Sequence, residues 1–159
     1  MRVSIVLALL CGVSCGGAAP LEPAPPAAMP AFVSLEGEAG AGDGHLLERS
    51  RASGGKTVHL GPGQERRWTL KVTGAMDYRV SVTYSNSRWG ENEMITVSVD
   101  GVALRPFKSI DTGEDTEGWN TFVTEPLGAS SVAPGPRVIT VAVAGGDGCV
   151  EIDRVNLQR

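Results

Sequence analysis

Histidine and cysteine are scarce in this sequence, and several catalytic motifs are missing from it. Its 159 residues include 2 histidines and 3 cysteines, and they contain neither an HExxH nor a CxxC motif. No glycine-rich loop precedes a helical segment in the way that phosphate-binding loops do. Carboxylates are plentiful, but nothing in the sequence selects the pair that a glycosidase needs. We therefore expect a protein that is not an enzyme.

Positive charge is also limited. The chain has 14 Lys and Arg residues against 18 Asp and Glu residues, which gives a formal net charge of −4. Arg66 and Arg67 are adjacent, but one pair does not make a basic patch. Proteins that bind nucleic acid concentrate Lys and Arg on one face, so we expect no nucleic-acid partner.

The N-terminus has the layout of a secretory signal. Arg2 is followed by an apolar run from Val3 to Val13 and then by small residues. The run is too short to span a bilayer, which is typical of a signal peptide rather than a membrane helix. We assign residues 1–15 to the signal peptide and expect the mature protein to be secreted or held in the bacterial cell envelope.

Two ways of processing this signal remain open. The segment GVSC, which ends at Cys15, resembles a bacterial lipobox, in which the cysteine is lipidated and becomes the first residue. Gly12 stands where a good lipobox has leucine. The alternative is ordinary cleavage among Gly17, Ala18 and Ala19, which would give a soluble secreted protein. We favour the lipoprotein, in which Cys15 would be the single membrane anchor, because the next segment resembles a tether.

Residues 16–31 are rich in proline and alanine. Five prolines lie between Pro20 and Pro30, and such a composition favours extended conformers over packed structure. We expect a semi-rigid spacer here, followed by one domain at 32–159. Cys149 is the one cysteine in that domain, so an internal disulfide is excluded, and we expect it to be a small packed side chain.

After the spacer, short runs of β-branched and aromatic residues alternate with turn residues. In the run YRVSVTYS, alternate residues from Tyr78 to Tyr84 fall on one face of a strand. The pair Asp100-Gly101 in VSVDGVAL is the strongest hairpin signal in the chain. No stretch of ten residues shows a helical period. We therefore predict an all-β fold, an antiparallel β-sandwich, with Trp68 in its core.

Two glutamates, Glu36 and Glu38, stand one residue apart in the stretch LEGEAG. On a strand both carboxylates point to the same face, where they repel each other unless something positive lies between them. Either a bound cation or full solvation on an edge strand would relieve that repulsion.

The segment from Phe32 to Leu157 resembles the family 35 carbohydrate-binding modules and their family 6 relatives. The resemblance implies a β-sandwich of the jelly-roll type that binds a polysaccharide or glycan without catalysis. It is carried by the order and spacing of seven segments along the chain: SLEGEAG, SGGKTVHL, YRVSVTYS, VSVDG, EGWNTFVTEP, APGPRVITVAV and VEIDRVNL.

The resemblance also suggests what holds the two glutamates together. In this family, two acidic residues on the first strand and an aspartate on the last strand bind a structural Ca²⁺. The matching residues here are Glu36, Glu38 and Asp153. Ca²⁺ takes six to eight oxygen ligands, and we expect a backbone carbonyl near Arg49 to complete the set. The alternative is a solvated glutamate pair with a surface pairing of Asp153 and Arg154.

Sugar sites pair flat aromatic faces with planar polar groups, so tryptophans in loops are the first candidates. Trp89 lies in the loop SNSRWGENE, and Trp119 begins the expected strand WNTFVTE after an acidic loop. Each tryptophan could instead pack against the core. The candidate ligand-binding residues are Trp89 with Asn86 and Arg88, and Trp119 with Asn120, together with Asp147 of a third loop.

The resemblance bears on two of these residues. Trp119 matches the aromatic residue of the family's ligand loop, and Asp147 lies where the family often has asparagine. An aspartate at this position removes a donor and adds a negative charge, which disfavours acidic sugars. Arg88 could offset that charge, because its guanidinium matches a carboxylate in a bidentate manner.

The acidic loop at 111–117 has two interpretations. Asp111, Glu114, Asp115 and Glu117 could bind a second Ca²⁺, although such runs are more often solvated surface loops.

Taken together, these patterns predict a monomeric, non-catalytic module that binds carbohydrate at the cell surface or outside the cell and holds one structural Ca²⁺. One alternative is a structural or protein-interaction β-sandwich of the bacterial envelope that binds no sugar. A small glycan-acting enzyme would need two carboxylates across a cleft, for which Asp111 and Asp147 are one conceivable pair at about 5–10 Å.

Overall fold

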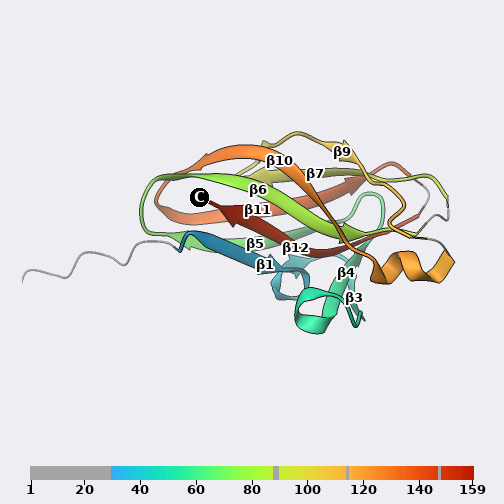
Figure 1. The fold of residues 1–159 in the computed structure, drawn as a ribbon. Helices are drawn as coiled ribbons and strands as arrows, with labels where there is room; N and C mark the ends of the chain where they lie inside the picture. The colour runs from blue at the N-terminus through green and yellow to red at the C-terminus, as the bar shows by residue number, and fades with distance from the viewer. Residues whose placement is uncertain (1–29, 88–89, 114, 147) are drawn as a thin grey trace, which may run out of the picture.

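The computed structural model describes residues 30–87, 90–113, 115–146 and 148–159, which form a sandwich of two antiparallel β-sheets (Figure 1). The predictions made for the signal peptide, for Cys15 and for nearly all of the spacer concern residues outside these ranges. Within the described part of the chain, no helix is long and apolar enough to cross a membrane.

The first sheet has the strand order β10-β6-β12-β4-β3, and β1 pairs with β12 beside β4. Every neighbouring pair in it is antiparallel. The strands are β1 (Phe32–Glu36), β3 (His45–Glu48), β4 (Lys56–Leu60), β6 (Met76–Ser85), β10 (Val123–Val132) and β12 (Val150–Gln158).

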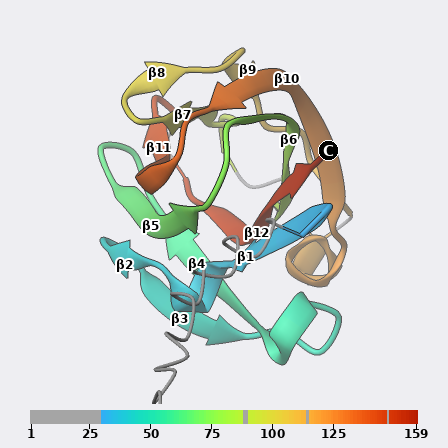
Figure 2. The same cartoon turned by 90° about the vertical axis from the view of Figure 1, so that its left-hand side faces the viewer.

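The second sheet has the order β2-β5-β11-β7-β8, and the short β9 pairs with β7. Its strands are β2 (Ala41–Gly42), β5 (Glu65–Val72), β7 (Met94–Val99), β8 (Val102–Ala103), β9 (Phe107–Lys108) and β11 (Gly135–Ala144). Three short 3₁₀ turns complete the described elements: η1 (Gly37–Ala39), η2 (Ser53–Gly55) and η3 (Asp115–Asn120). Figure 2, which looks along the strands, shows the two sheets as facing layers.

The core lies between the sheets and follows the alternation of the sequence. Tyr78 and Tyr84, at the two ends of the predicted buried face of β6, are 0% and 2% exposed. Trp68 is buried as predicted, and its indole Nε1 donates a hydrogen bond to the carbonyl oxygen of Glu36 at 2.7 Å. This bond links β5 of the second sheet to the end of β1 in the first, so it helps to fix where the two glutamates lie.

The predicted hairpin is present between β7 and β8. Asp100 and Gly101 have φ angles of 50° and 80°, the two left-handed residues that a tight hairpin turn of this kind needs. The predicted strand WNTFVTE is displaced, however. Trp119 and Asn120 end the 3₁₀ turn η3, and β10 begins only at Val123.

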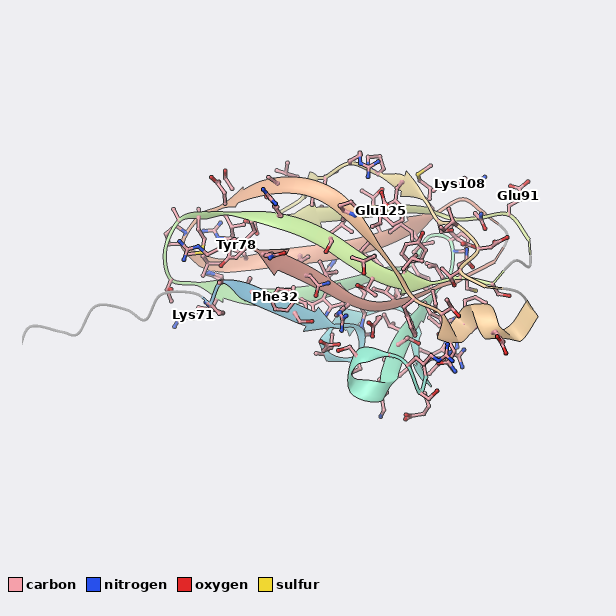
Figure 3. The ribbon with its side chains drawn as sticks, viewed as in Figure 1. Phe32, Lys71, Tyr78, Glu91, Lys108 and Glu125 are labelled. Atoms are coloured by element: carbon pink, nitrogen blue, oxygen red, sulfur yellow. The ribbon has the colours of Figure 1, made fainter. Side chains whose placement is uncertain are left out.

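The start of the domain and a group of loops lie at opposite ends of the long axis of the sandwich. Figure 3 places Phe32 and Lys71 at one end and Glu91 at the other. The turn η3 lies at the same end as Glu91 (Figure 1). We call this the loop end.

Candidate functional site

The loops predicted to bind a ligand meet at the loop end. The backbone N–H of Thr112 donates to the carbonyl oxygen of Asn86 at 3.1 Å, which ties the loop after β6 to the loop before η3. A Cβ atom on Gly146 would lie 2.8 Å from the carbonyl oxygen of Glu91, so the turn before β12 packs against the same group. Three segments far apart in the sequence are therefore neighbours in space.

Asn86 itself is placed differently from the prediction. Its side chain is 3% exposed, and its amide donates to Glu93 Oε2 at 3.0 Å and to Ser109 Oγ at 2.9 Å. Both of these contacts lie inside the protein, so the amide is not available to a ligand in this conformation. Asn86 instead joins the loop after β6 to the segment after β9.

Glu93 is the centre of this inner network. It is 1% exposed, its backbone N–H donates to Ser109 Oγ at 3.0 Å, and Ser109 Oγ donates to its carboxylate at 3.1 Å. Cys149 lies close by as a half-buried free thiol. Burial raises the pKa of this thiol, and the negative charges of Glu93 and Glu151 raise it further, which fits the expectation of an unreactive side chain.

Trp119 and Asn120 lie at the surface of the loop end, both partly exposed. Asn120 Oδ1 accepts a hydrogen bond from the backbone N–H of Arg51 at 3.3 Å, and its Nδ2 donates to Ser50 Oγ at 3.3 Å. A hollow of about 340 Å³ is lined by Ser50, Arg51, Glu117 and Asn120. The structure thus brings Asn120 and Trp119 of η3 next to the loop that follows β3.

Three of the predicted ligand residues, Trp89, Arg88 and Asp147, lie outside the described residues, as does Glu114 of the acidic loop.

A charge pair with a fully buried carboxylate lies two contacts away from Trp119. Glu151 of β12 is 0% exposed, and its Oε2 accepts hydrogen bonds from Arg49 Nε at 2.7 Å and from Thr57 Oγ1 at 2.8 Å. Arg49 Nη2 also donates to Oε1, which makes the contact bidentate. Burial alone would raise the pKa of Glu151, but the nearby His59 together with the hydrogen bonds from Arg49 and Thr57 outweighs burial and leaves this pKa below its ordinary value.

His59 connects this pair to the tryptophan. The structure places its Nδ1 3.5 Å from Glu151 Oε1, and its ring centroid lies 5.6 Å from that of Trp119 and 4.7 Å from that of His45. Contacts of this kind join strands that are remote in sequence, so alternation within β4 could not predict them.

The three predicted metal ligands also lie near one another. Asp153 is 2% exposed, and its Oδ1 accepts a hydrogen bond from the backbone N–H of Ser53 at 2.8 Å. Burial is the main cause that raises the pKa of Asp153, to about 6. Arg154 and the Ser53 bond oppose this shift, whereas the charges of Glu36 and Glu38 add to it. The three carboxylates therefore repel one another through a partly dry region.

Two of their oxygens have no partner within the described ranges of the chain. Oε2 of Glu36 and Oε2 of Glu38 are buried without a hydrogen bond, whereas Oε1 of Glu36 accepts one from Ser34 Oγ at 2.7 Å. Buried carboxylate oxygens without donors are costly, and hard oxygen donors are the ligands that Ca²⁺ prefers. The donor chemistry thus fits Ca²⁺.

Side chains alone do not complete such a site. The described residues contain no group of three His, Cys, Asp or Glu side chains already arranged to hold a metal ion. Backbone oxygens would have to contribute, and the contact between Ser53 and Asp153 places the segment around η2, just after Arg49, at the cluster.

A second hollow, of about 520 Å³, lies on the outer face of the first sheet. Phe32, which is 53% exposed, lines it together with Arg79, Ser81, Pro126 and Asn156. Because Phe32 marks the end of the sandwich opposite to the loops, this hollow is separate from the group around Trp119 (Figure 3).

Comparison with solved structures supports the fold. A family 35 carbohydrate-binding module from Clostridium thermocellum superposes with a TM-score of 0.66 at 18% identity, over 79% of this chain and 96% of that one. A family 35 module from an environmental isolate gives 0.65 at 16% identity, over 80% and 93%. An exo-β-1,3-galactanase from Phanerochaete chrysosporium, solved with β-1,3-galactotriose, gives 0.61 at 23% identity, over 80% of this chain and 29% of the enzyme.

No sequence-family model and no curated protein matches the chain. At these levels of identity the structural similarity establishes architecture. The sandwich described here therefore has the fold of the family 35 carbohydrate-binding modules.

Proposed function

We propose that this protein is a non-catalytic module that binds a polysaccharide or glycan through its loop end. The observation that carries the proposal is the partly exposed pair Trp119 and Asn120 beside an open hollow, on a fold shared with carbohydrate-binding modules. An indole face suits the apolar C–H face of a pyranose, and an amide suits its hydroxyl edge.

The polar groups around the hollow have capacity left for a ligand. Asn120 uses one of its two amide hydrogens on Ser50, and its Oδ1 accepts one bond from Arg51. Ser50 and Arg51 belong to the loop after β3, so a sugar placed in the hollow would contact two segments at once. Contact with two rigidly placed segments is what a specific polar site needs.

We further propose one structural Ca²⁺ at Glu36, Glu38 and Asp153. The two buried oxygens without partners and the mutual repulsion of the carboxylates support it. An ion here would join the end of β1 to β12, and it would close a loop of more than 100 residues between Glu38 and Asp153. Its role would be to stabilise the fold; it would take no part in a reaction.

The location outside the cytoplasm, either as a lipoprotein anchored through Cys15 or as a secreted protein, is part of the proposal. It is supported by the signal-like N-terminus and the Pro/Ala-rich spacer. The alternative, an envelope module without sugar binding, is decided by the same experiment as the ligand.

That experiment is a microarray of plant and microbial polysaccharides probed with the purified protein, followed by calorimetric titration of the glycans that bind. Replacing Trp119 with alanine is expected to weaken binding at least about 10-fold, because an aromatic platform is lost. Phe32→Ala is the matched control, since Phe32 is an exposed aromatic residue beside a hollow at the other end.

The possible outcomes distinguish between the two candidate sites and the envelope module without sugar binding. Binding that Trp119→Ala weakens and Phe32→Ala spares supports the loop end as the site. The reverse result would move the site to the outer face of the first sheet. A properly folded protein that binds no glycan on the array would favour the envelope module.

A further inference from the structure

The two walls of the loop-end hollow are both connected to one buried carboxylate. Glu117 and Asn120 of η3 form one wall and Ser50 and Arg51 the other. Trp119 directly precedes Asn120 in η3, and Glu151, which is 0% exposed, contacts residues that lead to both walls. A fully buried carboxylate must be compensated by hydrogen bonds or by a paired charge, and Glu151 has both.

The first connection runs to the loop after β3. Arg49 donates through Nε and Nη2 to the two oxygens of Glu151, and it immediately precedes Ser50 and Arg51 of the hollow. A bidentate guanidinium–carboxylate contact fixes orientation as well as distance. The position of this loop is therefore tied to β12.

The second connection runs to η3. His59 Nδ1 faces Glu151 Oε1 at 3.5 Å, and the His59 ring packs against the ring of Trp119 at 5.6 Å between centroids, tilted by 53°. Nδ1 is buried and makes no hydrogen bond within the part of the chain that the structure describes. A proton on Nδ1 would therefore point at Glu151, which would set both the tautomer and the tilt of the ring.

We propose that Glu151 is a positioning residue of the ligand site: it touches no ligand, but it sets the Trp119 platform through His59 and the opposite wall through Arg49. The importance of this role rests on the proposed function, whereas the role itself can be tested without any sugar. Thr57, which donates to the same carboxylate, completes its support from β4.

The test compares wild-type protein with Glu151→Gln by NMR of the ¹⁵N-labelled chain, with the Trp119 indole resonance assigned from a Trp119→Phe variant. Glutamine keeps the shape of the side chain but removes the charge and one acceptor. We expect the Trp119 indole resonance and the backbone resonances of residues 49–51 to shift together. Acrylamide is the second probe, and it should quench the Trp119 fluorescence more strongly in the variant.

Glu93→Gln is the matched control. Glu93 is also almost fully buried at the loop end, but it is bonded to Asn86 and Ser109 rather than to His59 or Arg49. A loss of stability alone would act in both variants, whereas the shifts at Trp119 and at 49–51 should occur in Glu151→Gln only. If Glu151→Gln does not fold, Arg49→Lys keeps the charge and loses the bidentate contact. Residues 49–51 adjoin that substitution, so the readout is then the Trp119 indole resonance, which should shift as Glu151 reorients against His59.

Unchanged Trp119 and 49–51 resonances in a folded Glu151→Gln variant, or an unchanged Trp119 resonance in a folded Arg49→Lys variant, would overturn the proposal, as would equal shifts in Glu93→Gln. Neither result would depend on whether a glycan binds. The role of Glu151 and the proposed glycan binding can therefore be overturned separately.

Discussion

The carboxylate of Glu38 occupies the space that a side chain at position 54 would fill. A Cβ atom on Gly54 would lie 2.3 Å from Glu38 Oε1, far inside van der Waals contact, and Gly54 has a φ angle of 70°. With the Glu38 carboxylate in this position, the segment around η2 can approach it only because residue 54 has no side chain.

The first prediction follows from this contact. Gly54→Ala should displace Glu38 and lower the thermal midpoint by more than Gly55→Ala does. Gly55 also has a left-handed φ, of 79°, but a Cβ there meets nothing within 4 Å. Both variants carry a backbone penalty of about 1–2 kcal/mol. The difference between their thermal midpoints therefore reports the cost of the contact with Glu38. Equal midpoints in thermal melts would show that the approach to Glu38 is not restrictive.

Calcium should stabilise the protein. At a calcium concentration 100-fold above Kd, binding contributes about 2.7 kcal/mol, which corresponds to a rise of about 10 °C in the melting temperature relative to EDTA. Glu36→Ala and Asp153→Asn should each abolish that rise. Asp77→Asn is the control, because Asp77 is an exposed carboxylate on β6 that accepts a bond from Ser131. A rise that persists in both cluster variants would place the ion elsewhere.

The hairpin between β7 and β8 should contribute a small acid-sensitive stability. The pKa of Asp100 is lowered mainly by the hydrogen bond from the Val138 backbone N–H and also by Arg137, with burial opposing. Because the folded pKa lies below the unfolded one, this stability is present above about pH 4 and is lost as the pH falls through the folded value. Asn at position 100 tolerates the same turn, so Asp100→Asn should flatten the acid side of a stability–pH curve. An unchanged curve would contradict this assignment.

Processing of the N-terminus can be read directly by mass spectrometry. Lipidation should leave Cys15 as the first residue with acyl chains attached, and Cys15→Ser should release the protein into the medium. An unmodified N-terminus among Gly17, Ala18 and Ala19 would establish ordinary cleavage instead.

Most of the fold could be predicted because alternation is a local property. The buried face from Tyr78 to Tyr84, the core position of Trp68 and the turn at Asp100-Gly101 each depend on residues next to one another in the chain. The long β10 was harder, because Pro126 and Gly128 interrupt its pattern. They coincide with a register shift against β6, a bulge that lets the strand continue.

The candidate site was harder to predict from local sequence patterns. Trp119 and Asn120 could be predicted as candidates from their place after an acidic loop, but the partners of Asn120 in the loop after β3 are 69 and 70 residues away. The sequence predicts Asn86 to be a ligand residue, because a polar residue in a loop gives no sign that another loop will cover it. Burial of such residues is set by how loops pack, which no periodicity encodes.

The position of Phe32 shows which end of the sandwich is joined to the spacer. The chain enters β1 at the end remote from η3, so a spacer fastened to a membrane would hold the hollow on the far side of the domain, facing outward (Figures 1 and 3). The 16 residues of the spacer would reach about 50 Å as an extended polyproline segment. An anchored protein built in this way would present the hollow away from its own membrane, whereas one tethered from the loop end would turn the hollow toward that membrane.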